Sequence, residues 1–233
     1  MVNKAPELGV IIAAAGDSQR MGNLNKIFAP LGNKPLLAWS VDTCQKCHLI
    51  DQIVIALRSD DLELGQKLAT EREWTKVTDI YPGGPLRQDS VKRGLHKLVS
   101  CDWVMIHDGA RPFLTLNLIQ KGLEAVRETG AAIAAVPVNE TIKLANGAET
   151  IEKTLQRSEL WIAQTPQMFK FEIITEAYEE LTMEVTDDAA AVERLGCKVK
   201  LFPGTYNNIK ITTPTDLALA EVIVSDVESG YRL

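Results

Sequence analysis

The sequence predicts an α/β fold built on a mostly parallel sheet. Short apolar runs rich in β-branched residues alternate with amphipathic stretches of helical period over residues 8–136. Polar or glycine-rich segments follow three of the apolar runs, after residues 13, 81 and 107. Because ligands bind beyond the carboxyl ends of parallel strands, we expect these three segments to meet at one site.

The first part of the chain alternates between strand and helix. Strands are expected at 8–13, 51–57, 76–81, 103–107 and 132–136, and helices at 35–47, 60–72 and 115–129. Pro35 fits the first turn of its helix, where the amide hydrogen that proline lacks would be unpaired anyway. A further helix is expected to begin near Asp89 or Ser90, since either residue can cap it.

The pattern changes at residue 137. Apolar and polar residues alternate around Asn146-Gly147, a dipeptide favoured in tight hairpin turns. A polar hairpin buries little by itself, so we expect this arm, at about 137–162, to pack on a partner or to cover the site.

The last third of the chain returns to helices and a strand. Helices at 170–181 and 186–195 and a strand at 198–202 are expected, and Thr213, Pro214 and Asp216 indicate the start of a last helix to about residue 225. No repeat or linker divides the chain, so residues 1–233 are interpreted as one domain with an arm.

Composition argues against several classes of protein. The net charge of −6 disfavours general nucleic-acid binding, because phosphate-backbone binders are usually basic. No apolar run reaches the roughly 18 residues of a membrane-spanning helix. Residues 4–15 loosely imitate a secretory signal, but Pro6 and Glu7 stand where its basic region belongs. A cytoplasmic protein is therefore expected.

Cys44, Cys47 and His48 match the C-x-x-C-H pattern of covalent haem attachment. Both cysteines also lie on the apolar face of the helix expected at 35–47. Haem attachment requires an export compartment, and a zinc site would need a second ligand pair that the sequence lacks. We expect these cysteines to pack in the core, and a haem or redox protein is kept only as a distant alternative.

The loop after the first strand is the first candidate site. Ala14, Ala15 and Gly16 are small, which lets backbone amides approach an anion closely. Arg20 and Lys26 follow, and two cations favour a polyphosphate. The sequence has neither the G-x-G-x-x-G fingerprint nor the G-K-[ST] ending of a P-loop, so a different nucleotide loop is indicated.

Ordered motifs then carry a specific resemblance. Ala14-Ala-Gly-x-x-x-Arg20-Met-Gly22 with Lys26 resembles the signature loop of sugar-phosphate nucleotidylyltransferases. The later motifs are Gly83-Gly84 with Arg87 and Ser90, His107-Asp-Gly-Ala-Arg-Pro112, Pro137-Val-x-x-Thr-x-Lys143, Arg157, Gln164-Thr-Pro-Gln167, Thr186-Asp187 and Asn208-Ile-Lys210. Together they resemble the 2-C-methyl-D-erythritol 4-phosphate cytidylyltransferases over essentially the whole chain. The sequence departs from the family pattern at Ser18, Asn25, Ile27, Pro85 and Gly109.

The resemblance implies a Rossmann-like three-layer domain with a protruding β-hairpin arm. It implies transfer of a cytidylyl group from CTP to 2-C-methyl-D-erythritol 4-phosphate, with release of pyrophosphate, in the non-mevalonate isoprenoid pathway. Both reactants are anionic, so the chain must supply positive charge and alignment rather than a covalent nucleophile.

The resemblance also assigns roles by matching positions. The catalytic residues would be Arg20, Lys26 and Lys210. The nucleotide would be held by Ala14, Ala15, Gly16, Gly84, Arg87, Ser90, Asp108 and Gly109. The second substrate would be held by Arg111, Thr141, Arg157, Thr165 and Thr186.

Two roles of Asp108 stay open. This residue ends a buried strand, where an unpaired carboxylate is costly. It would either bind Mg²⁺ together with the substrate phosphates or pair with Arg111 as a structural link. His107, directly before it, is interpreted as a packed core histidine.

In the family such arms embrace a second subunit, which implies a homodimer in which Thr141 and Arg157 serve the neighbour's site. One alternative is a cytidylyltransferase for another polyol phosphate, such as ribitol 5-phosphate, although Lys143, Arg157 and Trp161 favour methylerythritol phosphate. Another is a nucleotide-binding protein without catalytic activity.

Overall fold

A seven-stranded sheet forms the centre of the computed structural model, which describes residues 8–16, 25–99 and 101–228. Its strands are β1 (Leu8–Ala13), β4 (Gln52–Leu57), β5 (Val77–Pro82), β6 (Trp103–Asp108), β7 (Ala131–Pro137), β10 (Trp161–Lys170) and β11 (Lys200–Pro203). They lie in the order β11-β7-β10-β6-β1-β4-β5. All neighbours are parallel except β10, which runs antiparallel to both β6 and β7. The expected α/β fold with a mostly parallel sheet is confirmed.

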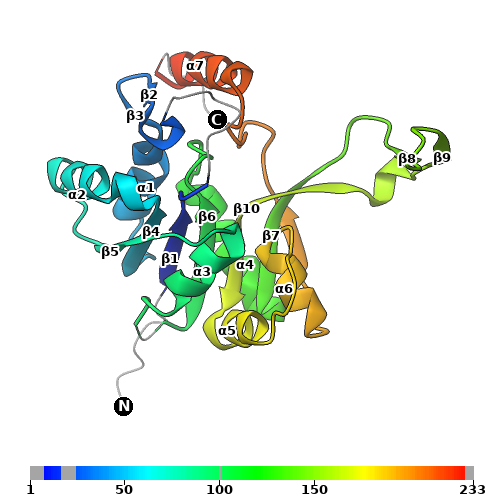
Figure 1. The fold of residues 1–233 in the computed structure, drawn as a ribbon, viewed down its shortest axis with the longest axis horizontal. Helices are drawn as coiled ribbons and strands as arrows, with labels where there is room; N and C mark the ends of the chain where they lie inside the picture. Colours follow the sequence, from blue (N-terminus) through cyan, green and yellow to red (C-terminus); the bar gives the residue numbers. More distant parts are fainter. Residues whose placement is uncertain (1–7, 17–24, 100, 229–233) are drawn as a thin grey trace.

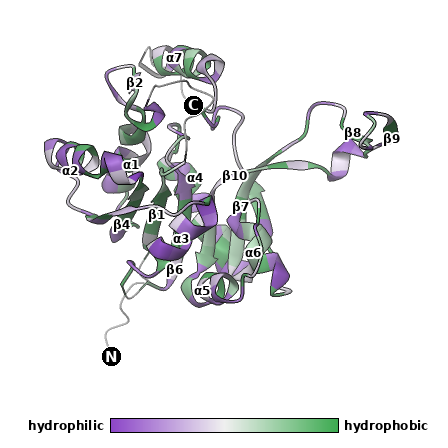
Figure 2. Ribbon diagram, in the orientation of Figure 1, coloured by the Kyte–Doolittle hydropathy of each residue, from purple (hydrophilic) through white to green (hydrophobic). Residues whose placement is uncertain are grey.

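Helices cover both faces of the sheet, which gives three layers (Figure 1). One face packs against α1 (Leu36–Lys46), α2 (Leu62–Glu71) and α4 (Leu116–Thr129), and the other against α3 (Arg87–Leu95), α5 (Phe171–Glu179) and α6 (Asp188–Arg194). The period of two in β1 explains this division, because Val10 and Ile12 join the first core and Ile11 joins the second. Figure 2 shows the corresponding hydrophobic colouring of the central strands.

A third, smaller core lies under α7 (Pro214–Glu228). It joins Ala220 and Val224 of α7 to Phe113, Ile211 and the short ribbon of β2 (Pro30–Leu31) and β3 (Lys34–Pro35). The expected start of α7 is confirmed, since Thr213 donates its amide to Asp216 at 2.8 Å and accepts the amide of Asp216 at 3.3 Å. The helix continues to Glu228, beyond its expected end.

The structure differs from the sequence predictions at three places. Helix α3 begins at Arg87, because the Asp89 carboxylate accepts the amide of Leu86 at 3.0 Å from within the first turn. Strand β10 was not predicted, because its glutamines and proline lack the apolar pattern of a strand, although Gln164 and Gln167 are buried. Pro35 precedes α1 as its N-cap residue rather than lying in its first turn.

The arm contains β8 (Lys143–Ala145) and β9 (Ile151–Thr154), followed by a short 3₁₀ turn, η4 (Arg157–Glu159). It projects from the body on the segments that leave β7 and return to β10 (Figure 1). The expected two-residue Asn-Gly turn is wrong, because residues 146–150 connect the strands. Asn146 accepts the amides of Ala148 and Thr150, and Glu149 rather than Gly147 takes the positive φ, at 57°.

The cysteine prediction is confirmed. Cys44 and Cys47 are 0% and 3% exposed and lie in the core between α1 and the sheet. Burial raises the pKa of the Cys44 thiol. Among the described residues, no group of three or more His, Cys, Asp or Glu side chains could hold a metal ion, and none of the described helices is long and apolar enough to cross a membrane.

Candidate active site

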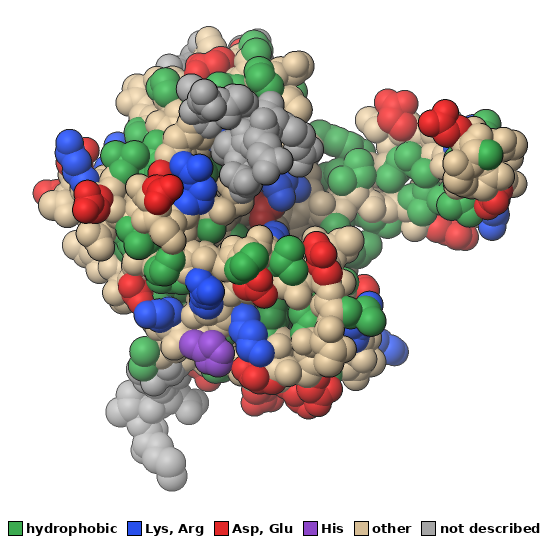
Figure 3. Space-filling model, in the orientation of Figure 1, with side chains coloured by type: hydrophobic (Ala, Val, Ile, Leu, Met, Phe, Trp, Pro, Cys, Tyr) green, Lys and Arg blue, Asp and Glu red, His purple; other side chains and the backbone are tan. Residues whose placement is uncertain are grey.

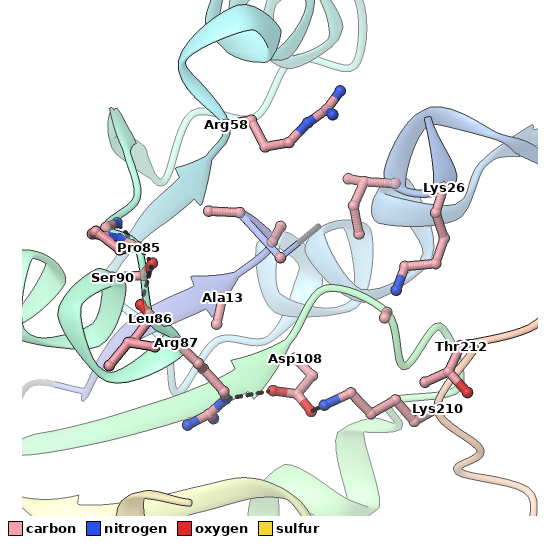
Figure 4. Close-up of a pocket in the computed structure, with 16 residues that line it drawn as sticks. Ala13, Lys26, Arg58, Pro85, Leu86, Arg87, Ser90, Asp108, Lys210 and Thr212 are labelled. Atoms are coloured by element: carbon pink, nitrogen blue, oxygen red, sulfur yellow. Dashed lines mark hydrogen bonds and ion pairs between the residues drawn. The ribbon is translucent and has the colours of Figure 1, made fainter. Parts of the chain in front are cut away.

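A pocket of about 390 Å³ lies at the carboxyl edge of the sheet (Figure 4). The segments after β1, β5 and β6 all line it, which confirms their predicted convergence. Lys26 faces them from η2 (Lys26–Phe28), and Lys210 comes from the segment before α7. Figure 3 shows basic and acidic side chains at a hollow in the middle of this face.

The loop after β1 forms one wall. The amide of Ala14 donates to the carbonyl of Ala56 at 3.0 Å, so the sheet already uses this donor. Ala15 and Gly16 continue along the pocket. A Cβ built on Gly83 would lie 2.2 Å from the Cβ of Ala15, which shows how closely the loops after β1 and β5 approach. Arg20 and Ser18 lie outside the described residues.

The loop after β5 forms the adjoining wall. Gly84 donates its amide to the Ser90 hydroxyl at 3.0 Å, and this hydroxyl donates to the carbonyl of Leu86 at 3.4 Å. A Cβ on Gly84 would lie 2.2 Å from the Cβ of Asp89, so glycine is required for this close turn. Pro85, where the family has an acidic residue, also lines the pocket.

Asp108 is the charged centre of the site. Its Oδ1 accepts from Arg87 Nε at 3.0 Å, and its Oδ2 lies 2.8 Å from Lys210 Nζ. The Nε of Arg111 is more distant, at 3.8 Å, so the expected Arg111 link is the weakest of the three ion pairs. Burial alone would raise the pKa of Asp108, but the charges of Arg87, Lys210 and Arg111 outweigh it and hold this pKa well below its usual range.

Asp108 is ionised at neutral pH and is held by these cations. Gly109 donates its amide to the carbonyl of Ala13 at 2.9 Å, and a Cβ at Gly109 would lie 2.8 Å from that of Ala14. The loop after β6 is therefore fixed against the loop after β1, which places Asp108 beside the pocket.

His107 lies at the centre of a closed ring of hydrogen bonds. The carbonyl of Arg111 can only accept, so His107 Nε2 carries the proton of the neutral ring and donates to this carbonyl at 3.0 Å. Nδ1 therefore accepts from Thr165 Oγ1 at 3.1 Å, and the same hydroxyl oxygen accepts the amide of Asp108 at 3.0 Å. Arg111 donates to the carbonyl of Asn208, and Asn208 Nδ2 donates to the carbonyl of Thr165 at 2.7 Å. The expected core role of His107 is confirmed.

A second pocket, of about 220 Å³, adjoins the first and shares Arg87, Asp108 and Lys210 with it. It holds three of the residues assigned to the second substrate: Arg111, Thr165 and Thr186. The Nε of Arg111 is buried and makes no hydrogen bond with the residues that the structure describes. A buried guanidinium with an unsatisfied donor suits an anionic ligand.

Thr141 and Arg157 do not reach this pocket. Both are exposed on the arm, and Arg157 donates to the carbonyl of Asn139 at 2.9 Å. Within this chain the five expected residues therefore fall into two groups, one in the body and one on the arm.

Arg58 and Asp188 are two of the residues at or beside the site that the sequence did not reveal. Arg58 lines the larger pocket directly after β4, and its Nε donates to Asp61 Oδ2 at 2.7 Å. Arg58 directly follows the strand expected at 51–57, and this position at the carboxyl end of a parallel strand could have predicted that it lies at the site. Asp188 binds Arg87 through both carboxylate oxygens from 101 residues away, and nothing local in the sequence pointed to that contact.

The comparisons with known proteins agree with each other. The family model described as 2-C-methyl-D-erythritol 4-phosphate cytidylyltransferase (IspD) matches residues 8–226. A relative of that name from Dehalococcoides mccartyi is 46% identical over 218 residues, 94% of this chain and 96% of its own length. Another, from Alkaliphilus oremlandii, is 42% identical and covers 95% of this chain and 96% of itself.

Solved structures give the same result for the fold. The 4-diphosphocytidyl-2C-methyl-D-erythritol synthase from Anaerococcus prevotii aligns with a TM-score of 0.85 and 30% identity, over 94% of this chain and 96% of that one. The 2-C-methyl-D-erythritol 4-phosphate cytidylyltransferase from Thermus thermophilus aligns with a TM-score of 0.77 and 32% identity, over 93% and 98%.

Proposed function

This chain belongs to the 2-C-methyl-D-erythritol 4-phosphate cytidylyltransferase family, and we propose that its two adjoining pockets hold the two substrates of that reaction. The enzyme transfers the cytidylyl group of CTP to 2-C-methyl-D-erythritol 4-phosphate and releases pyrophosphate, a step of isoprenoid biosynthesis. The main support for placing one substrate in each pocket is the Asp108–Lys210 ion pair, because both residues line both pockets.

The proposed reaction is an in-line displacement. A phosphate oxygen of the acceptor attacks the α-phosphorus of CTP, the bond from that phosphorus to the bridging oxygen breaks, and pyrophosphate leaves with the electron pair. A phosphate monoester is ionised near neutral pH, so no strong general base is needed. Arg20, Lys26 and Lys210 would offset the charge that collects on the phosphoryl oxygens in the transition state.

Nucleotide and acceptor would approach from opposite sides of the shared pair. The loops after β1 and β5, with Ala15, Gly16, Gly84 and Ser90, would hold CTP in the larger pocket. Arg111, Thr165 and Thr186 would hold the acceptor in the smaller one. The unsatisfied Nε of Arg111 supports an anionic group there.

The test is pyrophosphate release from CTP with a panel of polyol phosphates. We expect turnover with 2-C-methyl-D-erythritol 4-phosphate and little with ribitol 5-phosphate, and equal rates would contradict the acceptor assignment. Lys26→Ala and Lys210→Ala should each lower kcat by about 10²–10³-fold. A binding protein without catalytic activity would instead bind CTP with no turnover in any variant. Lys200→Ala removes a lysine that pairs with Glu128 on the surface and serves as control.

We propose Mg²⁺ as the cofactor. Asp108 fits the ion because it is ionised and borders both pockets, and Mg²⁺ favours one or two carboxylates together with substrate phosphates. Bound there, the ion would neutralise phosphate charge, while Arg87 and Lys210 keep the Asp108 carboxylate in place. Chelation with EDTA should abolish pyrophosphate release and added Mg²⁺ should restore it. Turnover that persists in EDTA would refute the proposal.

We also propose a homodimer formed through the arm. The arm and its base expose large apolar side chains, among them Leu144 at 48%, Ile151 at 60% and Trp161 at 44%, which a partner could cover. Arg157 would then serve the neighbour's acceptor pocket. Complementation tests this arrangement, because a mixture of Arg157→Ala and Lys210→Ala chains that exchange subunits contains heterodimers with one intact site.

Such a mixture should recover about a quarter of wild-type turnover, since half of the dimers are mixed and each has one working site. The mixture would stay as inactive as its parents if Arg157 served its own subunit. Each variant refolded alone is the control.

A cytoplasmic location follows from the same proposal. Residues 8–13, the apolar part of the apparent export signal, form β1 and pair with β4 and β6 in the centre of the sheet. CTP and a sugar phosphate are charged metabolites that do not cross membranes unaided. Cell fractionation that finds the activity in an exported fraction would refute this location.

A further inference from the structure

Asp188 holds Arg87 from the side opposite the catalytic pocket. Arg87 donates NH1 and NH2 to the two carboxylate oxygens of Asp188 at 2.9 and 2.8 Å, and its Nε to Asp108 at 3.0 Å. Asp188 is 0% exposed, and the Tyr178 hydroxyl donates to its Oδ1 at 2.6 Å. Neither Asp188 nor Tyr178 lines either pocket.

The position of Asp188 is set by the start of α6. Asp187 caps this helix by accepting the amide of Ala190 at 3.0 Å. Gln167 of β10 accepts the amide of Ala189 at 3.0 Å and donates to Asp187 at 2.8 Å. The first turn of α6 is therefore tied to the central sheet, which places Asp188 under Arg87.

The two terminal nitrogens of Arg87, which form the fork of its guanidinium, bond to Asp188, so only Nε is left to bond to Asp108. A guanidinium binds a carboxylate best through two parallel N–H bonds, and one such pair occupies both terminal nitrogens of Arg87. Asp108 then receives only Nε, on Oδ1, which leaves Oδ2 to Lys210 at 2.8 Å. Without the Asp188 charge, the strongest carboxylate within reach of the Arg87 fork would be Asp108 itself.

We propose that Asp188, supported by Tyr178, is a positioning residue for catalysis: it keeps the fork of Arg87 away from Asp108 so that Asp108 holds Lys210 at the reacting phosphoryl group. This inference rests on the proposed role of Lys210. Neither residue touches substrate in this arrangement, and both act through Arg87.

The test compares Asp188→Asn with a matched control, Asp42→Asn. Asp42 has the same chemistry away from the pockets: it accepts Arg72 through both carboxylate oxygens at 2.8 and 2.6 Å and the indole of Trp74 at 2.8 Å. Both variants break a buried pair, so both should lower the melting temperature. Only Asp188→Asn should lower kcat, by about 10–100-fold with the KM for CTP within about threefold, because a displaced Lys210 affects the transition state more than binding.

Tyr178→Phe is the milder variant if Asp188→Asn does not fold. It removes one hydrogen bond from Asp188 but keeps the charge, so kcat should fall about two- to fivefold with KM unchanged. A kcat for Asp188→Asn within twofold of wild type, or a loss no larger than that of Asp42→Asn, would overturn the inference. If Asp188→Asn does not fold, a kcat for Tyr178→Phe equal to that of wild type would overturn it.

Crystal structures separate this inference from the proposed function. In Asp188→Asn, Arg87 should turn toward Asp108, and the distance from Lys210 Nζ to Asp108 should exceed about 4 Å, the limit for an ion pair. An unchanged Lys210–Asp108 pair in Asp188→Asn would refute the positioning role whatever the turnover. Failure of the wild-type enzyme to release pyrophosphate would refute the proposed function alone.

Discussion

At the scale of single residues, His107 links the stability of the protein to its site. The ring is fully buried, and burial lowers its pKa to about 4. Both ring nitrogens are used by Thr165 and by the carbonyl of Arg111. This arrangement fixes the backbone on both sides of Asp108, and it holds only while the ring is neutral, since a protonated Nδ1 could not accept from Thr165.

This burial predicts a pH dependence of stability. In the unfolded chain the ring regains a pKa near its ordinary value of about 6.5, so between pH 6.5 and 4 the unfolded state binds more protons than the folded state. The free energy of unfolding should therefore fall as the pH falls through that window, by on the order of 3 kcal/mol. The contribution of the depressed pKa of Asp108 is lost only below about pH 4, the ordinary range of that carboxyl.

Urea unfolding between pH 7 and 4.5 measures this slope. His107→Gln should flatten it, because glutamine does not titrate, whereas His48→Gln changes an exposed histidine and should leave it in place. A wild-type free energy that stays constant over this range would contradict the assignment.

Arg58 makes a second prediction at this scale. It lines the larger pocket and is held by Asp61, which also accepts from Asn25 at 2.6 Å, next to Lys26. Its side chain is 38% exposed, so its charge is screened and should matter less than those of Lys26 and Lys210. Arg58→Ala should raise the KM for CTP about three- to tenfold and leave kcat within about twofold. Steady-state kinetics measure both constants, and Lys67→Ala, at an exposed position on α2, is the control. A lowered kcat with an unchanged KM for CTP in Arg58→Ala would show instead that Arg58 acts on the transition state.

Pocket residues such as Gly84, Asp108 and Lys210 could be predicted because each follows a strand or lies in a motif. The residues that bond to the site side chains and backbone could not be predicted from the sequence. The Arg87–Asp188 pair spans 101 residues and depends on how α6 packs against β10, which no local pattern encodes. The hydrogen bond from the Ala14 amide to the carbonyl of Ala56 likewise depends on the pairing of β1 with β4.

At the scale of elements, α4 shows how a local signal fixes a boundary. Thr115 caps its start by accepting the amide of Leu118 at 3.1 Å, and Gly130 ends it in the left-handed region at φ 78°. A Cβ at Gly130 would also lie 2.7 Å from Ile173 Cδ1. The helix expected at 115–129 therefore agrees with α4 to within one residue.

Gly130→Ala should therefore lower the free energy of unfolding by about 1 kcal/mol or more, because alanine is strained at this φ. Gly147→Ala is the control, since its added Cβ meets nothing within 4 Å and its φ is not left-handed. Equal losses in the free energy of unfolding for Gly130→Ala and Gly147→Ala, measured in urea, would show that the left-handed φ of Gly130 does not matter to stability.

Two features that the sequence did not predict depend on particular side-chain hydrogen bonds. Strand β10 carries polar residues because Gln164 and Gln167 bond to Thr205, Asp187 and Ala189 rather than to solvent. The loop 146–150 departs from an Asn-Gly turn because the Asn146 side chain captures two amides of its own loop. The order of polar and apolar residues alone cannot distinguish a strand such as β10 from a loop, or the loop 146–150 from a two-residue turn.

At the scale of the whole molecule, the arm should decide the state of association. Ile151 is 60% exposed on β9. Ile151→Asp should leave the far-ultraviolet circular dichroism unchanged and halve the mass seen by sedimentation, because a buried charge opposes the proposed interface. Leu64→Asp, at an exposed position on α2, is the control and should leave the mass unchanged. An Ile151→Asp chain that keeps the wild-type mass would place the interface elsewhere.

The construction of the arm has a consequence for evolution and engineering. None of the residues of β8 and β9 belongs to the three cores, and the strands bond mainly to each other. The whole arm, at about 137–162, contributes no residue to these cores, so it could be exchanged between related enzymes without rebuilding the body that folds around β1. If Thr141 and Arg157 face the neighbouring subunit, such a graft would transfer choice of partner and choice of acceptor in one step, so the two traits would be inherited together.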